Sequence, residues 1–433
     1  MPETMRPTND IPRPAAPATR GRPAAGRLRW LFVLAVGVVL ALPLWMGLKI
    51  LKTDNWQIWI PAYLSDLAAG RYGSNDESRH LIVLMCDHWE PGRGASGLER
   101  ADWWLDRYEQ VAARHTDSQG RPFQYSWFYP IDTFDQAVIE RVAATARAGL
   151  GEIEVHWHHE HQDGQTFAAD LAAALPLFTR VGALAPDEDA PARFGFIHGN
   201  WTLDNSGLAE WCGVDEEIRI LQEHGCYADF TFPALWKTSQ PRIINRIFYA
   251  EDTPGPKSYD ETGVVAKVGA PGRGLMLLPG PLGLDFQDPR IFMECGSLDD
   301  SQGSGLTGRV FAPATAAGYF KPHRVGLWDR LGVGVQGRPE WVFAKLHAHG
   351  VADRELFFGG ALEAMLDAVE EYCRRRGLGL HYVTAREAYN IARAAEAGLT
   401  GDPALYYDYE IPAPRTRLGE AGELAEAAAP ADR

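Results

Sequence analysis

The chain has 433 residues, of which 46% are hydrophobic, and a formal net charge of −15 at pH 7. This hydrophobic content can build a large core and excludes wholesale disorder, while the acidic charge repels phosphate backbones and argues against a nucleic-acid partner. The five cysteines are scattered without a C-x-x-C pair, so the sequence predicts neither a disulfide framework nor a zinc ribbon.

The N-terminal region is predicted to anchor the protein in the inner (cytoplasmic) membrane by a single pass. Residues 1–29 form a Pro-, Ala- and Arg-rich arm that is expected to be disordered, and residues 30–50 begin with an uncharged apolar run at 30–48. A run of this length, at about 1.5 Å per residue, spans a hydrocarbon core of roughly 30 Å. The preceding arginines place the N-terminus in the cytoplasm and the later residues in the periplasm or another extracytoplasmic compartment. A cleavable signal peptide is the alternative, but its apolar region would be shorter.

The rest of the chain alternates strand-like and helical patterns. Residues 51–78 are expected to be a linker, residues 79–400 a catalytic domain and residues 401–433 a C-terminal tail. Strand-like apolar runs lie at 80–87, 123–130, 152–158, 193–198, 226–232, 274–279, 341–347 and 380–384. Because helical patterns separate most of these runs, we predict an α/β fold, an irregular (β/α)7–8 barrel. An open doubly wound sheet is the competing architecture, but no G-x-G-x-x-G or P-loop motif follows the first run.

Local signals refine this outline. Asp135 and Gly149 flank a helical pattern as an N-cap and a C-cap residue. The long Pro- and Gly-rich stretches 233–273 and 280–338 are predicted to be functional loops or lids rather than separate domains.

Histidines gather where the predicted strands end. In a parallel barrel the active site lies at the C-terminal ends of the strands. Chance scatter would not place eight of the 13 histidines at such ends: His88, His156, His158, His159, His161, His198, His347 and His349.

The segment HWHHEH, residues 156–161, carries the densest group. On a strand, His156 and His158 point to the same face because side chains alternate, and His161 follows in the loop beyond. Imidazoles with a carboxylate match a catalytic Zn²⁺ site of three protein ligands, although Ni, Co or Fe would also accept imidazole. A polar loop enriched in histidine by accident is the alternative. Glu154 alternates with apolar neighbours and is expected to face outward.

Other strand ends contribute further candidates. Asp87 and His88 end the first run within LMCDHWEP, and His347 lies in KLHAHG near the end of a late run. The structural alternatives are a helix cap for Asp87 and a core position for His347. Residues beside these clusters are predicted to bind substrate, with packing as the alternative: Trp89, His198, Asn200 and Asp229.

The order of these residues resembles that of the NodB-like polysaccharide deacetylases, within the wider glycoside hydrolase/deacetylase barrel superfamily. The resemblance spans residues 80–390 and consists of an Asp after the first strand, a His cluster after the third, and a late Leu-x-His. It implies a barrel and a divalent metal, with zinc expected. By this resemblance Asp87 is the general base, His156 is a metal ligand and His347 is the general acid. His88 occupies the position of a second, metal-binding Asp.

The chain departs from the family pattern at the metal ligands. His88 stands where the family has Asp, and Glu160 lies four residues after His156, where the family has a second histidine. No Arg-x-Pro motif is present near FTFPA. The remaining ligand is therefore His158, Glu160 or His161, and we predict a metal set of His88, His156, His158 and His161.

These observations predict a membrane-anchored, metal-dependent hydrolase that removes acetyl groups from an envelope or exported polysaccharide. A glycoside hydrolase on the same barrel is the first alternative, and it would pair Asp87 with Asp229 or Glu90. A non-catalytic glycan-binding or assembly protein is the second.

Overall fold

The computed structural model describes residues 55–73, 79–184, 192–208, 210–235, 237–287, 293–298 and 320–416. The chain separates into two compact units, Met1–Lys49 and Ile50–Arg433, and every described residue belongs to the second. The predicted arm at 1–29 and the predicted anchor at 30–50 lie outside the described residues. In the described part of the chain, no helix has the length and apolar character needed to cross a bilayer.

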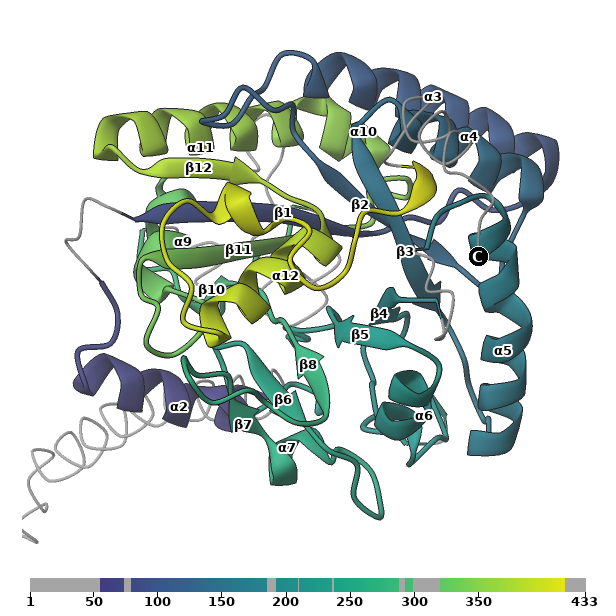
Figure 1. Ribbon diagram of the computed structural model, residues 1–433, viewed down its shortest axis with the longest axis horizontal. Coiled ribbons are helices and arrows are strands. Elements are labelled where there is room, and N and C mark those ends of the chain that lie inside the picture. Colours follow the sequence, from purple (N-terminus) through teal and green to yellow (C-terminus); the bar gives the residue numbers. More distant parts are fainter. Residues whose placement is uncertain are drawn as a thin grey trace, which may run out of the picture. The chain divides into compact units, whose positions relative to one another are not determined.

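The central sheet is mostly parallel (Figure 1). Its strands are β1 (His80–His88), β2 (Tyr125–Pro130), β3 (Gly151–Trp157), β4 (Phe194–His198), β5 (Cys226–Asp229), β6 (Phe248–Ala250), β7 (Val264–Val265), β8 (Leu275–Leu277), β11 (Trp341–Ala348) and β12 (Gly379–Tyr382). Their order is β11–β1–β2–β3–β4–β5–β8–β6–β7, and β12 also pairs with β1. This confirms the predicted α/β class with a parallel sheet, and the arrangement is compatible with a barrel-like fold.

Each predicted strand has an observed counterpart, whereas the predicted loop regions contain additional short strands. β6 and β7 extend the sheet in antiparallel fashion beyond β8. β9 (Gly283–Leu284) and β10 (Met293–Glu294) form a separate antiparallel pair. Strands of two or three residues are too short to show a period of two, so the sequence pattern did not indicate them.

The two faces of the sheet pack against different helices. The helices are α3 (Gly94–Ala112), α4 (Gln136–Arg147), α5 (Gly164–Arg180), α6 (Glu217–Glu223), α7 (Tyr259–Thr262), α9 (His323–Leu331), α10 (Arg354–Leu356), α11 (Leu362–Arg376) and α12 (Ala385–Glu396). Leu81 and Val83 of β1 share a core with α3, α4, α5 and α11, on what we call the outer face. Ile82 and Leu84 share a core with α12, on the inner face. Figure 1 shows α3, α4, α5 and α11 around the periphery and α12 across the sheet.

The predicted helix cap at Asp135 is confirmed. The Asp135 carboxylate accepts hydrogen bonds from the amides of Ala137 and Val138 at 3.0 and 3.2 Å, at the start of α4. Gly149 follows the end of this helix with a φ of 82°, a conformation that glycine adopts without strain.

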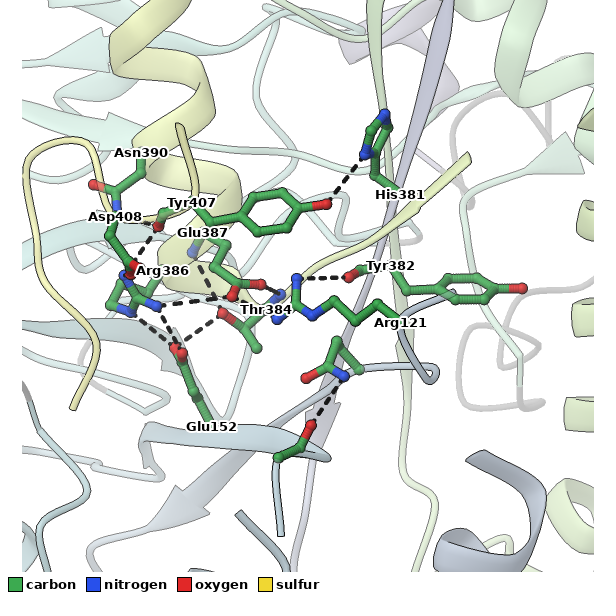
Figure 2. Close-up of polar contacts among 12 residues, drawn as sticks. Arg121, Glu152, His381, Tyr382, Thr384, Arg386, Glu387, Asn390, Tyr407 and Asp408 are labelled. Atoms are coloured by element: carbon green, nitrogen blue, oxygen red, sulfur yellow. Dashed lines mark hydrogen bonds and ion pairs between the residues drawn. The ribbon is translucent and has the colours of Figure 1, made fainter. Parts of the chain in front are cut away.

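A buried ion pair joins β3 to α12 (Figure 2). Arg386 donates to both oxygens of Glu152, at 2.8 and 3.0 Å, and the Thr384 hydroxyl donates to the same carboxylate at 2.9 Å. Arg386 also donates to the backbone oxygens of Tyr407 and Ile411 at 3.0 and 2.7 Å. The pair therefore ties the start of β3 to α12 and to the residues that follow it.

The predicted linker at 51–78 contains a packed helix. α2 (Trp56–Ala68) buries Trp59 and Tyr63 against a small apolar cluster, and Asp66 pairs with Arg246 at 2.7 Å. Part of the expected linker therefore belongs to the folded unit. Its apolar residues have partners far away in the sequence, which the local pattern does not show.

The predicted tail at 401–433 is also folded in its first part. Residues 401–416 include the short helix η4 (Pro403–Tyr406) and bury Ile411, and the Asn390 side chain holds two of their backbone oxygens. Residues 417–433 lie outside the described part of the chain.

Candidate metal centre

The inner face of β3 carries a row of polar side chains that runs from Glu152 through Glu154 to His156. Glu154 is buried and accepts hydrogen bonds from the Gly195 amide at 2.6 Å and from the Tyr227 hydroxyl. Burial raises the pKa of Glu154 to about 8. The predicted alternation of Glu154 with apolar neighbours is present in β3. The expectation that Glu154 faces solvent is wrong, because both faces of this strand are buried.

Glu90, His156 and His158 converge at the C-terminal end of this row, and we call them the Glu90 site. Nε2 of His156 lies 2.9 Å from Oε1 of Glu90, and Nε2 of His158 lies 3.1 Å from the same oxygen. The His156 side chain is fully buried, whereas those of Glu90 and His158 are 29% and 34% exposed. One donor atom from each residue lies within 4.8 Å of the others. The site therefore opens toward solvent on one side.

Each histidine of the Glu90 site has an acceptor at its other nitrogen. Nδ1 of His156 is 3.1 Å from the carbonyl oxygen of Ile197, which can only accept, so Nδ1 carries the proton and Nε2 presents its lone pair toward Glu90. Nδ1 of His158 is 3.6 Å from the Asp132 carboxylate, which favours the same orientation. Metal-bound imidazoles are held in this way by a carbonyl or a carboxylate behind the ring.

The charges at the Glu90 site call for a cation. Burial lowers the pKa of His156 even though Glu90 opposes this, so the ring is neutral at pH 7. Burial raises the pKa of Glu90, but the bond to His156 and the nearby imidazoles outweigh it and leave the pKa below its ordinary value. With the proton on Nδ1, a nitrogen lone pair faces a carboxylate oxygen at 2.9 Å, and a cation bound to both atoms would relieve their repulsion. The residues present therefore fit a divalent metal ion.

Aromatic rings surround the Glu90 site. The His88 ring centroid is 4.6 Å from those of His156 and His349 and 4.7 Å from that of Trp201. Nδ1 of His88 has no hydrogen-bond partner among the described residues, and burial together with the neighbouring imidazoles lowers the pKa of His88. The structure thus brings His88 beside the site, but the donor atoms that lie within 4.8 Å of one another do not include it.

A cavity of about 520 Å³ opens next to Glu90. It lies between the residues after β1 and those after β11, and Arg100 and Arg354 line it together with Glu355. Its volume lies within the range of small-molecule sites, roughly 300–1,000 Å³. A ligand that fills it would extend to the Glu90 carboxylate.

The structure places Asp87 away from the Glu90 site. Asp87 points to the face of β1 opposite to His88, where its carboxylate accepts hydrogen bonds from the Tyr125 hydroxyl at 2.9 Å and the Gly350 amide at 2.8 Å. Its side chain is fully buried. A general base must reach water or substrate, and the structure shows no path from the buried Asp87 carboxylate to either, so the role of Asp87 as the base stays a prediction.

His347, the predicted general acid, is buried within the sheet. It pairs in register with Cys86, is 1% exposed, and its backbone bonds to Gly296 and Leu298. His349 follows two residues later on the same side of the chain, about 6–7 Å closer to the mouth at the usual rise per residue. His349 is partly exposed and contacts His88 and Trp201. The exposed imidazole at this strand end is therefore His349.

The predicted substrate-binding residues are mostly buried. Trp89 is fully buried against Trp104, and His198 is fully buried on the outer face. Asp229 is 1% exposed and accepts hydrogen bonds from the amide and hydroxyl of Thr231. Adjacent strands and loops cover these three side chains, so the structure does not support substrate contact by them and their role stays a prediction. Asn200 is partly buried, and its side chain donates to the Trp211 carbonyl at 3.3 Å.

His161 does not belong to the Glu90 site. It is exposed, has a left-handed φ of 52° and lies in the loop after β3, and the donor atoms that converge with Glu90 do not include it. Neither Glu90, a potential ligand, nor Asp132, which lies behind His158, was predicted from the sequence to lie at the metal site. The available signal was that each carboxylate follows a predicted strand within a few residues, as the histidines do.

Comparison with models of protein families gave no match, and neither did comparison with curated proteins. The chemistry of the Glu90 site therefore carries the functional proposal.

Proposed function

We propose that the protein is a metal-dependent hydrolase that removes acetyl groups from a polysaccharide, as the resemblance to NodB-like deacetylases suggests, on an incomplete (β/α)7–8 barrel. The observation that carries this proposal is the convergence of Glu90, His156 and His158 at the C-terminal ends of parallel strands. Active sites of parallel barrels lie at these ends.

Glu90, His156 and His158 would hold the metal ion, and zinc suits two imidazoles and a carboxylate. A bound zinc ion supplies Lewis acidity and lowers the pKa of a water ligand toward about 7. The chain's own contribution is to orient the ligands. Ile197 and Asp132 fix the two imidazoles, and Glu90 stays ionised because its pKa is held below the ordinary value.

We assign His349 the role of proton donor to the departing amine. It is the partly exposed imidazole at the end of β11, and its ring lies 4.6 Å from His88, which in turn contacts His156. Deacetylation requires a proton at the leaving nitrogen, and histidine is the side chain that most often acts as a general acid.

The surroundings of the site suit a sugar. Trp201 is partly exposed and lies beside His88 and His349, where its ring could stack on a sugar ring. The cavity beside Glu90 adds polar groups from Arg100 and Glu355. A glycoside hydrolase is less favoured, because Asp87 and Asp229 are both buried and only Glu90 of the three candidate carboxylates is partly exposed.

We propose that residues 30–50 anchor the enzyme in the inner membrane with its catalytic domain outside the cytoplasm. In support, α2 follows this segment closely and presents Leu64 and Leu67 to solvent at 51% and 52% exposure. Apolar residues on an exposed helix face are typical of a surface that meets a lipid headgroup region. Separation of membrane and soluble fractions tests this proposal.

The test of the proposed activity is acetate release from N- and O-acetylated oligosaccharides by the full-length protein. We expect release that a chelator abolishes and zinc restores. Release of new reducing ends without acetate would instead show a glycoside hydrolase. Absence of both products, with no metal bound at the Glu90 site, would show a non-catalytic protein.

Metal affinity at the Glu90 site is expected to fall as the pH falls. Burial lowers the pKa of His158, but the carboxylates of Asp132 and Glu90 outweigh it and raise the pKa above its ordinary value. A metal binds the neutral ring, so below this raised pKa a proton competes and the affinity should drop roughly tenfold per pH unit. The pKa of His156 is lowered, so this ring adds no second proton in the same range.

The measurement is a metal titration of the chelator-treated protein from about pH 8 to about pH 5, across the ordinary histidine pKa. The stability of the metal-free protein should change in the opposite direction. The pKa of His158 is raised in the folded state, so this residue stabilises the fold at acidic pH, and its contribution is lost as the pH rises through that pKa. A metal affinity that does not change over this range would contradict the assignment of His158 as a ligand.

A further inference from the structure

A second group of metal-binding side chains lies on the outer face of the sheet: His159, His198, Cys212 and Glu217, which we call the His159 cluster. His159 is the second residue after β3, and its ring packs on Trp157 and Phe167 of the outer core. His198 ends β4, Cys212 lies in the following loop, and Glu217 begins α6. The cluster is therefore on the opposite side of the sheet from His156.

The four side chains are buried and close together. His159, His198 and Glu217 have side-chain exposures of 1%, 0% and 0%, and Cys212 is fully buried. Nε2 of His159 lies 3.1 Å and Nε2 of His198 lies 4.0 Å from Oε1 of Glu217, and Sγ of Cys212 lies 3.4 Å from Oε2. One donor atom from each residue lies within 4.8 Å of all the others.

Among the described residues, the Glu217 carboxylate has no Lys or Arg partner. Its ion-pair partners there are His159 and His198, and its other hydrogen-bond donors are the Asp204 amide at 2.6 Å and the Cys212 thiol. Nδ1 of His159 is buried and has no hydrogen-bond partner in the described part of the chain. A fully buried carboxylate without a Lys or Arg partner is costly, and a metal ion would balance it.

The two histidines differ in readiness to bind. The Asn200 amide donates to Nδ1 of His198 at 3.1 Å, so a neutral His198 ring carries its proton on Nε2. His159, Cys212 and Glu217 therefore offer three donor atoms close together, and His198 would give up the hydrogen bond from Asn200 to present Nε2 as the fourth.

We propose that the His159 cluster is a structural zinc site, held by His159, Cys212 and Glu217 with His198 at the fourth position. Thiolate, imidazole and carboxylate are the donors that zinc accepts, and full burial is typical of a closed structural site rather than a catalytic one. The ion would tie β3, β4 and α6 to the loop that carries Trp201, and so support the wall of the Glu90 site. The inference does not depend on the proposed deacetylase activity.

The test is the absorption spectrum of full-length protein in which cobalt replaces the native metal. Cobalt bound to a thiolate gives a near-ultraviolet charge-transfer band, and the Glu90 site contains no sulfur ligand. We expect this band in the wild-type protein and about two metal ions per chain, one for each cluster. A wild-type cobalt spectrum without the thiolate band would overturn the proposal, whatever the enzymatic activity.

Matched cysteine variants assign the band. Cys212→Ala should lose the thiolate band and one metal ion, while Cys226→Ala, which removes another buried thiol outside the cluster, should keep both. His156→Ala should lose the other metal ion and keep the thiolate band. If Cys212→Ala retains the wild-type metal content, the His159 cluster is a hydrogen-bond network only.

Discussion

Replacing His156 with alanine is expected to remove the metal ion of the Glu90 site and to lower acetate release by at least about 10³-fold. His156 is fully buried, its Nδ1 is fixed by the Ile197 carbonyl and its Nε2 faces Glu90 at 2.9 Å. The ring sits between Glu90, His158 and His88, so its removal takes away the buried ligand of the site. Metal content by elemental analysis and acetate release on the same preparation provide the measurement.

The matched control is His161→Asn. His161 is an exposed histidine five residues further along the same segment, and its left-handed φ of 52° is one that asparagine tolerates. We expect this variant to keep the wild-type metal content and activity. Equal losses in both variants would point to a general disturbance of the segment, and full activity in His156→Ala would exclude the Glu90 site as the active site.

The second large effect concerns stability. Arg386→Met is expected to lower the free energy of unfolding by about 3–5 kcal/mol, because it leaves the Glu152 carboxylate buried without its cation. The two side chains are 3% and 1% exposed, and Figure 2 shows Arg386 between Glu152 and the backbone after α12. Methionine keeps much of the side-chain volume, so the loss reports mainly the missing charge and hydrogen bonds. Denaturant unfolding of the full-length protein measures it.

Two further variants make this prediction specific. Arg374→Ala removes an arginine from a solvent-exposed pair with Glu371, whose side chains are 72% and 46% exposed, and should cost about 0–1 kcal/mol. Adding Glu152→Leu to Arg386→Met removes the unpaired charge and should recover much of the lost stability. A cost below about 1 kcal/mol for Arg386→Met alone would show that the pair is not a main tie between β3 and α12.

The strand pattern was predictable because it is local. Each apolar run predicted from the sequence overlaps a strand of the sheet, and the alternation along residues 152–158 correctly separates His156 from its outer-face neighbours. The concentration of histidines at strand ends likewise indicated the edge of the sheet at which side chains that could hold a metal converge. Both features depend on the period of a single strand, which any stretch of sequence displays by itself.

Which strand-end residues meet was not predictable, because that depends on the other elements. Asp87 and His88 are neighbours in sequence, yet Asp87 turns toward Tyr125 and Gly350 while His88 turns toward His156. The same alternation separates His158, in the Glu90 site, from His159, in the cluster under α6. A family pattern of strand ends cannot show which of two adjacent side chains the packing buries.

The sequence by itself determined the α/β class, the strand positions and the gathering of potential metal ligands at one edge of the sheet. Only the tertiary structure decided that Glu90 crosses the end of β2 to reach His156, and that His198 belongs to a separate buried cluster. The physical reason is that periodicity sets the direction of a side chain relative to its own strand. The order of strands in the sheet, and the loops and helices that cover its two faces, set which directions converge.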